Sequence, residues 1–230
     1  PKGLYYYLFS FFSVIRGISL KPDVFVTRNL FSLIILLLFN KKVIVELHHD
    51  LSNEGRIVKF AFNYFNILNS KNIIKIVAIT NAVKNFLIRE LKVNKKKIKI
   101  IPSASSLQVK FSKLKKKKNY NIGYFGSLEK SKGYEFIINL SKKDINNNYY
   151  IYGGDKKSLD ILRKKNQKKN LYLHEYVPYK KLKYHISKMD VLIMPSNKKI
   201  LRSTGGVGNI AKYTSPLKLF DYLSAGKFII

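Results

Sequence analysis

The stretch "NIGYFGSLEKSKGYEFIINL", residues 121–140, contains one complete strand, loop and helix. Its first five residues are mostly apolar, and its middle carries Gly126 and Gly133. From Tyr134 onward the apolar residues recur at helical spacing. Glycines between an apolar strand and a helix are typical of the turns in parallel α/β sheets. The stretch therefore predicts one strand-to-helix unit.

The same unit recurs along the chain. Apolar strands are expected at "DVFVTR", "VIVELHH", "IVAIT" and "IKIIPS", and later at "YYIYGG", "LYLHEYV", "VLIMPS" and "FII". Helical patterns alternate with them, over residues 53–69 and from about residues 30, 80, 134, 158, 179 and 215, with Thr80 as an N-cap. This alternation predicts an α/β fold of parallel, doubly wound sheets with helices on both faces.

A break divides the pattern into two domains. The stretch "SASSLQVKFSKLKKKKN", residues 103–119, has a serine cluster, a lysine run and no periodicity. It predicts a linker at 105–118 between a first domain at 1–104 and a second at 119–230. Two such domains are expected to face a cleft between the carboxyl ends of their strands, where these folds bind ligands.

The charge balance is strongly basic, with 44 Lys and Arg against 13 Asp and Glu, a formal net charge of +31. This indicates either an anionic partner, such as a membrane surface or a phosphorylated substrate, or the lysine-rich composition of an AT-rich genome. No zinc-finger spacing or RNP motif occurs, so nucleic acid is not an expected partner. With no cysteine and no Asp-x-Asp, no metal site is expected.

No segment is expected to span a membrane. The apolar run "FSLIILLLF" has nine residues, whereas a spanning helix needs about 20. The aromatic opening "GLYYYLFSFFSVIRGISL" predicts a helix, either packed in the first domain or lying in a membrane interface.

The last stretch, "YTSPLKLFDYLSAGKFII", carries an acid and a base on one face of a helix. Ser215 is the expected N-cap and Pro216 the first helical residue, which leaves the amides of Leu217 and Lys218 for an anion. Lys218 and Asp221 lie one turn apart. They form either a surface ion pair worth about 0.2–0.5 kcal/mol or a site, in which the lysine binds phosphate and the carboxylate accepts from sugar hydroxyls.

The loop "GYFGSLEKSKG" offers a second phosphate-binding feature. Gly126 permits close backbone approach, and Lys132 lies at the start of the next helix. Amides at a helix start together with a lysine suit a phosphate group.

In order and content these motifs resemble those of the family 4 (group 1) glycosyltransferases, retaining enzymes of the GT-B fold. The resemblance covers essentially the whole chain. It implies an acceptor-side domain that lacks its first strand and glycine-rich loop, followed by a nucleotide-sugar donor domain that lacks its C-terminal end. The chain would then be a fragment that is not expected to be fully active by itself.

The resemblance also implies roles. Lys132 and Lys218 would neutralise the pyrophosphate, Asp221 would hold the ribose, and His48 or His49 would approach the transferred sugar as the catalytic-side histidine. The full set of implied donor-binding residues is Gly126, Ser127, Lys132, Tyr176, Val177, Ser215, Leu217, Lys218 and Asp221. The chain departs from the family pattern at Ser127, where an arginine is common, and at Tyr213, where many members have an acid.

The implied reaction is transfer of a sugar, with retention, from a UDP- or GDP-sugar to a hydroxyl of a saccharide or lipid-linked acceptor. The implied enzyme class is EC 2.4, without metal or cofactor, in cell-surface polysaccharide or glycolipid synthesis. The expected location is cytoplasmic, at the inner face of the plasma membrane. Two alternatives stay open, another GT-B enzyme such as a nucleotide-sugar epimerase, and a non-catalytic basic module that binds membranes.

Overall fold

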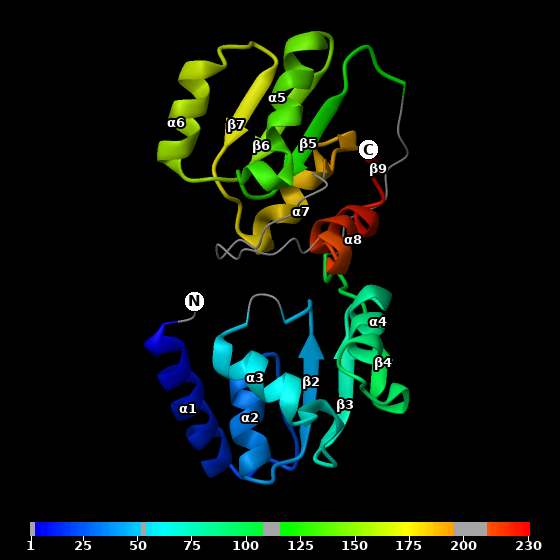
Figure 1. The fold of residues 1–230 in the computed structure, drawn as a ribbon. Coiled ribbons are helices and arrows are strands. Elements are labelled where there is room, and N and C mark those ends of the chain that lie inside the picture. The colour runs from blue at the N-terminus through cyan, green and yellow to red at the C-terminus, as the bar shows by residue number, and fades with distance from the viewer. Residues whose placement is uncertain (1–2, 52–53, 108–115, 196–210) are drawn as a thin grey trace. The chain divides into compact units, whose positions relative to one another are not determined.

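The computed structural model describes residues 3–51, 54–107, 116–195 and 211–230, which are coloured in Figure 1. They separate into two compact units. The first unit takes the described residues up to Pro102 together with 211–215, and the second takes all the others. Residues 108–115 of the predicted linker and Ser196 of "VLIMPS" lie outside the described residues. Residues 211–215 thus group with the first unit, although the sequence pattern placed them in the second domain.

The first unit is built on a parallel sheet. Its strands β1 (Phe25–Thr27), β2 (Val43–Leu47), β3 (Ile73–Ala78) and β4 (Ile98–Ile100) lie side by side in sequence order. All their pairings are parallel. The helices of this unit are α1 (Leu4–Ser19), α2 (Leu30–Leu38), α3 (Arg56–Tyr64) and α4 (Asn81–Arg89), with short 3₁₀ turns at Ile67–Asn69, Lys95–Lys97 and Ala211–Tyr213.

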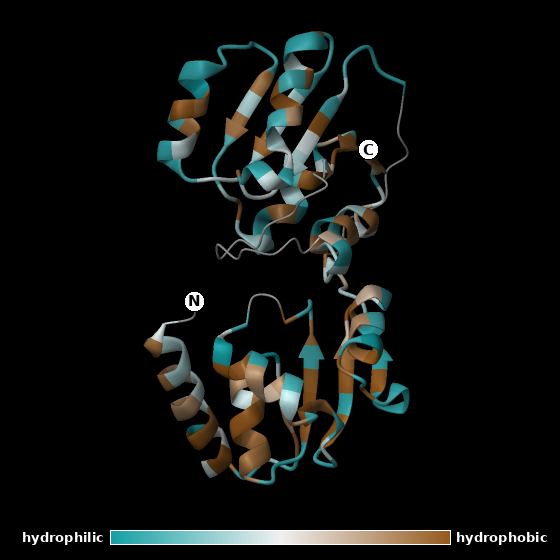
Figure 2. Ribbon diagram, viewed as in Figure 1, coloured by the Kyte–Doolittle hydropathy of each residue, from teal (hydrophilic) through white to brown (hydrophobic). Residues whose placement is uncertain are grey.

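Local sequence signals account for most of these elements. Val43, Val45 and Leu47 of β2 are buried in alternation, as expected for one face of a strand. Figure 2 shows the apolar residues of α2 and β2 in brown. Thr80 caps α4 as predicted, its hydroxyl accepting from the Val83 N–H at 3.2 Å.

The helix predicted over residues 53–69 is shorter in the structure. It spans Arg56–Tyr64, and a separate 3₁₀ turn follows at Ile67–Asn69. Asn66 between them has φ 47°, a left-handed conformation that ends the helix. Asn53, the predicted start, lies outside the described residues.

Helix α1 presents apolar side chains to solvent. Tyr5, Phe9 and Phe12 are 79%, 58% and 64% exposed. Ser10 is fully buried, and its hydroxyl accepts from Asn29 Nδ2 at 2.8 Å. The helix therefore buries Ser10 and Val14 and leaves several aromatic side chains exposed, whereas an ordinary surface helix exposes mainly polar residues. No helix within the described ranges is long and apolar enough to cross a membrane.

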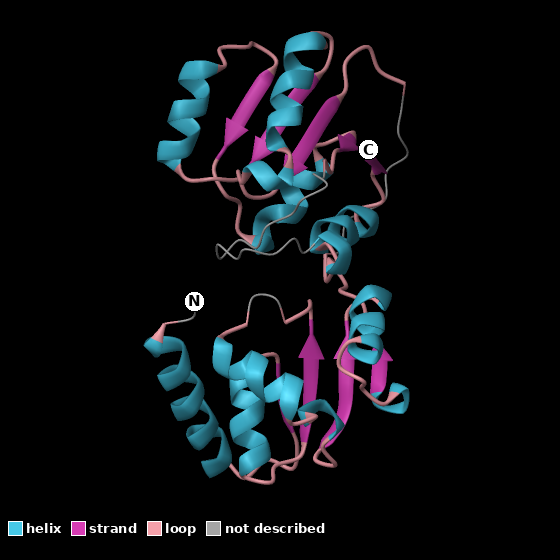
Figure 3. Ribbon diagram, viewed as in Figure 1, coloured by secondary structure: helices cyan, strands magenta, loops and turns pink. Residues whose placement is uncertain are grey.

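The second unit contains a five-stranded parallel sheet with helices on both faces (Figure 3). Its strands are β5 (Asn121–Phe125), β6 (Asn148–Tyr152), β7 (Leu171–His174), β8 (Val191–Leu192) and β9 (Phe228–Ile229), in the order β7-β6-β5-β8-β9. The chain progresses in one direction from β5 to β7 and then continues on the other side of β5. In sheets of this kind, ligands bind at the carboxyl ends of the strands beside such a switch point.

Successive residues of β5 feed two separate cores. Tyr124 packs with residues of α5 (Tyr134–Lys143) and α6 (Lys156–Lys165), whereas Phe125 packs with residues of α7 (Tyr179–Ser187) and α8 (Leu217–Ser224). Because neighbouring strand residues point to opposite faces, this alternation shows that both faces of the sheet are covered. The α/β fold class with parallel sheets is confirmed. Helix α6 begins two residues before the predicted Ser158, because Asp155 caps it.

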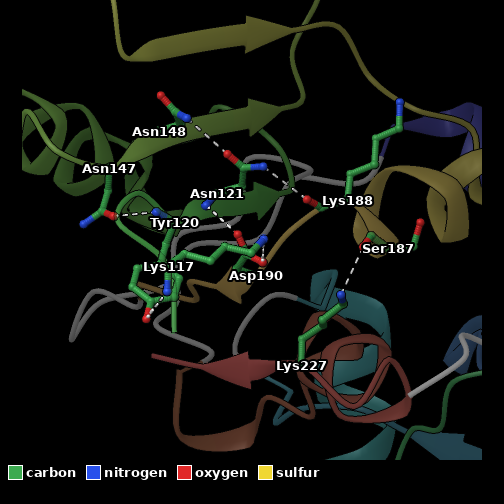
Figure 4. A network of polar contacts seen from close by, with 9 residues as sticks. All are labelled: Lys117, Tyr120, Asn121, Asn147, Asn148, Ser187, Lys188, Asp190 and Lys227. Atoms are coloured by element: carbon green, nitrogen blue, oxygen red, sulfur yellow. Dashed lines mark hydrogen bonds and ion pairs between the residues drawn. The ribbon is translucent and has the colours of Figure 1, made fainter. Parts of the chain in front are cut away.

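A polar network holds the amino ends of the second sheet (Figure 4). Asp190 accepts from the Asn121 N–H at 2.9 Å and pairs with Lys117 Nζ at 2.6 Å. Lys227, from the "AGKF" part of the last motif, donates to the Ser187 carbonyl oxygen at 3.0 Å. The network lies at the opposite end of β5 from Gly126, so it stabilises the sheet away from the carboxyl ends where ligands bind.

Candidate functional site

The loop after β5 begins at a glycine that a lysine approaches closely. A Cβ atom at position 126 would lie only 2.5 Å from Nζ of Lys218. The Gly126 N–H donates to the Tyr152 carbonyl oxygen at 2.9 Å, which holds the loop beside β6. Glycine at position 126 therefore leaves the space that the Lys218 ammonium occupies.

Lys218 is half-buried and lies next to a second lysine. Its Nζ is 4.1 Å from the centroid of the Tyr124 ring. Burial is the main cause that lowers the pKa of Lys218 to about 8; the positive charge of Lys132 acts in the same direction, and Glu129 opposes the shift. A bound anion would stabilise two neighbouring ammonium groups, and phosphate oxygens are a suitable partner for them.

Lys132 ends a 3₁₀ turn, Lys130–Lys132, that requires a glycine after it. Gly133 has φ 75°, and a Cβ there would lie 2.9 Å from the Pro195 Cβ. A side chain at this position would be both strained and crowded. Gly133 therefore fixes the turn that carries Lys132.

Helix α8 is anchored by one buried tyrosine. Tyr222 is fully buried, and its hydroxyl oxygen accepts from the Phe125 N–H at 2.9 Å. Burial raises the pKa of Tyr222, so the hydroxyl stays protonated. This contact fixes α8 against the end of β5 and thereby fixes the position of Lys218.

The start of α8 differs from the prediction. The helix begins at Leu217 with Pro216 as its N-cap, and no side chain caps it. Pro216 has ψ 109°, which is extended and not helical, so the prediction of Ser215 as N-cap and Pro216 as first helical residue is wrong by one position. Leu217 and Lys218 still open the helix.

Asp221 already binds two hydroxyl groups. Its Oδ1 accepts from Ser105 Oγ at 2.6 Å and from the Tyr179 hydroxyl at 2.9 Å. These residues border a pocket of about 410 Å³ together with Ala104, Ser106 and Leu217. Sequence reasoning missed Ser105 and Tyr179, which no local motif marks.

A larger pocket of about 490 Å³ lies beside the loop that follows β5. It brings together four of the predicted donor residues, Gly126, Ser127, Tyr176 and Val177, with Phe125, Tyr152, Gly153, Gly154, Asp155, Tyr179 and Leu182. The two pockets share Tyr179.

Gly153 and Gly154 were not predicted as site residues, although the "GG" after β6 is a signal that could have found them. A Cβ at Gly153 would lie 1.8 Å from the Gly126 carbonyl oxygen, so the backbones of these two loops touch. The Gly154 carbonyl oxygen accepts from the Tyr176 N–H at 3.2 Å. The glycines thus shape the pocket through close backbone approach.

The predicted histidines belong to the first unit. Strand β2 ends at Leu47, so His48 and His49 both follow the strand, and both line a pocket of about 120 Å³ with Arg28, Glu46 and Glu54. The alternation of strand side chains therefore does not separate the two histidines. No group of three or more metal-ligand side chains occurs among the described residues.

Comparison with known proteins shows which family part of this sequence is similar to. The family model for glycosyl transferases group 1 matches residues 106–208, which confirms the resemblance drawn from the motifs. A Klebsiella pneumoniae protein, named as an uncharacterized 41.2 kDa protein in the cps region, is 32% identical over 114 residues. That match covers 45% of this chain and 31% of the Klebsiella protein.

Solved structures share the fold. Alr3699/HepE from Anabaena, crystallised with UDP-glucose, has a TM-score of 0.62 at 13% identity, covering 94% of this chain and 62% of its own. A glycosyltransferase from Rickettsia africae has a TM-score of 0.58 at 16% identity, covering 85% and 57%. The sucrose-phosphate synthase of Thermosynechococcus elongatus has a TM-score of 0.55 at 13% identity, covering 79% and 52%. This chain spans less than two thirds of each of these proteins, and the likeness confirms the predicted GT-B fold class.

Proposed function

We propose that this chain acts as a group 1 glycosyltransferase, moving a sugar from a nucleotide diphosphate-sugar to an acceptor hydroxyl. One observation carries the proposal. Lys218 is held against Gly126 and beside Lys132 at the switch point of the second sheet, and neither lysine pairs with a carboxylate in the described structure. Two such lysines form a site for a pyrophosphate.

In the proposed complex the donor surrounds these lysines. The pyrophosphate lies between Lys132 and Lys218, and Asp221 accepts from the ribose hydroxyls. The two hydroxyls that Asp221 already binds, from Ser105 and Tyr179, support this role. The base enters the pocket beside Tyr176. The UDP-glucose complex of the Anabaena protein supports a UDP-sugar as the donor.

The chemistry proposed for the second unit is charge stabilisation. Departure of the nucleoside diphosphate leaves negative charge on its terminal phosphate, and ammonium groups fixed beforehand stabilise that charge without reorganising. Lys132 and Lys218 would act in this way, in place of a divalent cation. Retention of configuration and a sugar-orienting role for the His48 and His49 segment are part of the same proposal.

The acceptor and location follow from the surface and from the relative. We propose a saccharide or lipid-linked acceptor in surface polysaccharide synthesis, which the cps-region relative supports. A cytoplasmic enzyme held at an anionic leaflet is supported by the +31 charge and by the outward aromatic side chains of α1.

The test is calorimetric titration of the whole chain with UDP, UDP-glucose, GDP and uridine. We expect saturable diphosphate binding that is tighter than uridine binding. Absence of any nucleoside diphosphate binding, together with binding to anionic vesicles, would favour the basic membrane module. Incubating the chain with each UDP-sugar that binds, without an acceptor, distinguishes the two enzyme classes. An epimerase would interconvert the UDP-sugars, whereas a transferase would need an acceptor to react.

A further inference from the structure

The first unit contains a row of three hydrogen-bonded side chains, Glu46, His48 and Arg28. Arg28 Nη2 lies 3.0 Å from His48 Nδ1, and His48 Nε2 lies 2.5 Å from Glu46 Oε1. A guanidinium can only donate, so Nδ1 of His48 is the unprotonated acceptor. Nε2 then carries the hydrogen and donates it to the carboxylate. Both ring nitrogens of His48 are therefore engaged.

This row lies at the carboxyl ends of two neighbouring strands. β1 and β2 pair in parallel, with Thr27 opposite Val45. Arg28 directly follows β1, and His48 directly follows β2. Both line the pocket of about 120 Å³ in the first unit. In parallel α/β sheets this edge is where ligands bind.

Arg28 is exposed and has donors to spare. Its guanidinium has five N–H groups. Within the described ranges it makes one hydrogen bond, to His48, and no ion pair with a carboxylate. The hydrogen bond to His48 restrains a side chain that would otherwise lose more rotamer freedom on binding. A guanidinium held in this way offers a planar fork that matches two oxygens of a phosphate or carboxylate.

We infer that Arg28 binds an oxyanion carried by the acceptor, a phosphate or a carboxylate, and that His48 and Glu46 position it. The acceptor role rests on the proposed function, whereas anion binding at Arg28 does not. His48 is then a positioning residue that acts through Arg28. The proposal predicts an acidic acceptor in place of a neutral one.

The experiment uses nuclear magnetic resonance of the whole chain labelled with ¹⁵N at histidine and arginine side chains. The chain is titrated with glucose 6-phosphate, glucuronate and neutral glucose, without nucleotide. We expect saturable shifts of the His48 and Arg28 signals with at least one of the two anions and none with glucose. The anion that binds more tightly identifies the source of the oxyanion.

Variants separate recognition by Arg28 from general charge. Arg28→Gln should weaken anion binding roughly tenfold or more, and Arg28→Lys by less, since lysine keeps the charge and loses the fork. Arg16→Gln, which removes an exposed arginine of α1, is the matched control and should leave binding unchanged.

The positioning role has its own test. His48→Ala should weaken anion binding severalfold, and His48→Gln should restore most of it, because its amide can accept from Arg28 and donate to Glu46. The Arg28 signal reports both variants.

The inference is overturned if neither anion shifts these signals, if glucose shifts them equally, or if Arg28→Gln behaves as Arg16→Gln does. UDP binding, measured in the same samples, should survive Arg28→Gln. If the unaltered chain does not bind UDP at all, the proposed function is contradicted, but the result for anion binding at Arg28 still holds.

Discussion

Lys218 and Asp221 lie one turn apart on α8, yet the described structure contains no ion pair between them. Nζ of Lys218 turns to the Tyr124 ring and to Gly126, whereas Oδ1 of Asp221 accepts hydroxyl groups. The simple surface ion pair is therefore not formed. The two side chains on this face of the helix thus point to different surroundings. In the proposed complex Lys218 would bind the phosphates of a nucleoside diphosphate, and Asp221 would accept hydrogen bonds from its ribose.

Replacing Lys218 should separate diphosphate binding from nucleoside binding. Lys218→Ala removes a charge-assisted contact worth about 1.5–3 kcal/mol, so UDP binding should weaken roughly 10- to 150-fold. Uridine binding should change little, since uridine has no phosphate. Calorimetry with both ligands measures this difference. Lys169→Ala, at an exposed lysine on the same unit, is the control, and equal losses for the two ligands would contradict the assignment.

The lowered pKa of Lys218 predicts a pH dependence. Its pKa of about 8 in the folded chain lies below the ordinary lysine value of 10.5, because burial disfavours the charged form. The ammonium that binds phosphate is therefore present below pH 8 and is lost above it. UDP affinity should fall as pH rises from 7 to 9, and a bound diphosphate should raise the pKa. Lys218→Ala should remove this decline, and a decline that persists in the variant would assign it to another group.

Asp221 should act on the ribose. Asp221→Asn keeps a hydrogen-bond acceptor but loses the negative charge. The affinities for UDP and for uridine should therefore both fall by a similar factor. The unaltered chain should bind 2′-deoxyuridine less well than uridine, and the variant should distinguish them less. Asp160→Asn, an exposed acid paired with Arg163, is the matched control. Unchanged discrimination in Asp221→Asn would assign the carboxylate a structural role only.

Tyr222 should matter for stability more than for ligand contact. Tyr222→Phe leaves the buried Phe125 N–H without its acceptor, at a cost of about 1–3 kcal/mol in the free energy of unfolding. Denaturant unfolding measures that cost. Tyr176→Phe, whose side chain is 71% exposed, should change the free energy far less. Equal stabilities of the two variants would mean that α8 is held by other contacts.

Helix α1 should contribute a part of membrane binding that salt does not remove. Each lysine near an anionic surface contributes about 1 kcal/mol to binding. At physiological salt, screening limits this attraction to about 8 Å from the surface. Sedimentation with anionic vesicles at rising NaCl should therefore show a steep decline. Phe9→Ser with Phe12→Ser should remove the remainder. Phe136→Ser, also exposed, is the control. If the chain does not bind anionic vesicles even at low salt, the net positive charge reflects only the amino-acid composition and not membrane binding.

Local sequence patterns were sufficient for most of the elements. The run from Asn121 to Phe125 formed a strand, helices began at Tyr134 and Tyr179 as predicted, and Thr80 capped α4. These features depend on side-chain periodicity and on hydrogen bonds within a few residues, which a sequence displays directly. The errors were also local. Asn66 ended a helix by adopting a left-handed conformation, and Pro216 took the cap position that Ser215 was expected to hold.

Only the tertiary structure decided which side chains meet. The contact of Asp221 with Ser105 joins residues 116 positions apart, and its contact with Tyr179 joins residues 42 apart. Arg28 and His48 meet only because β1 and β2 pair in one register. Such contacts depend on strand order and on the packing of α8 through Tyr222, which no local periodicity encodes. The sequence by itself determined the kinds of residue at the strand ends, and the packing decided that Lys218 faces a glycine and Asp221 faces hydroxyls.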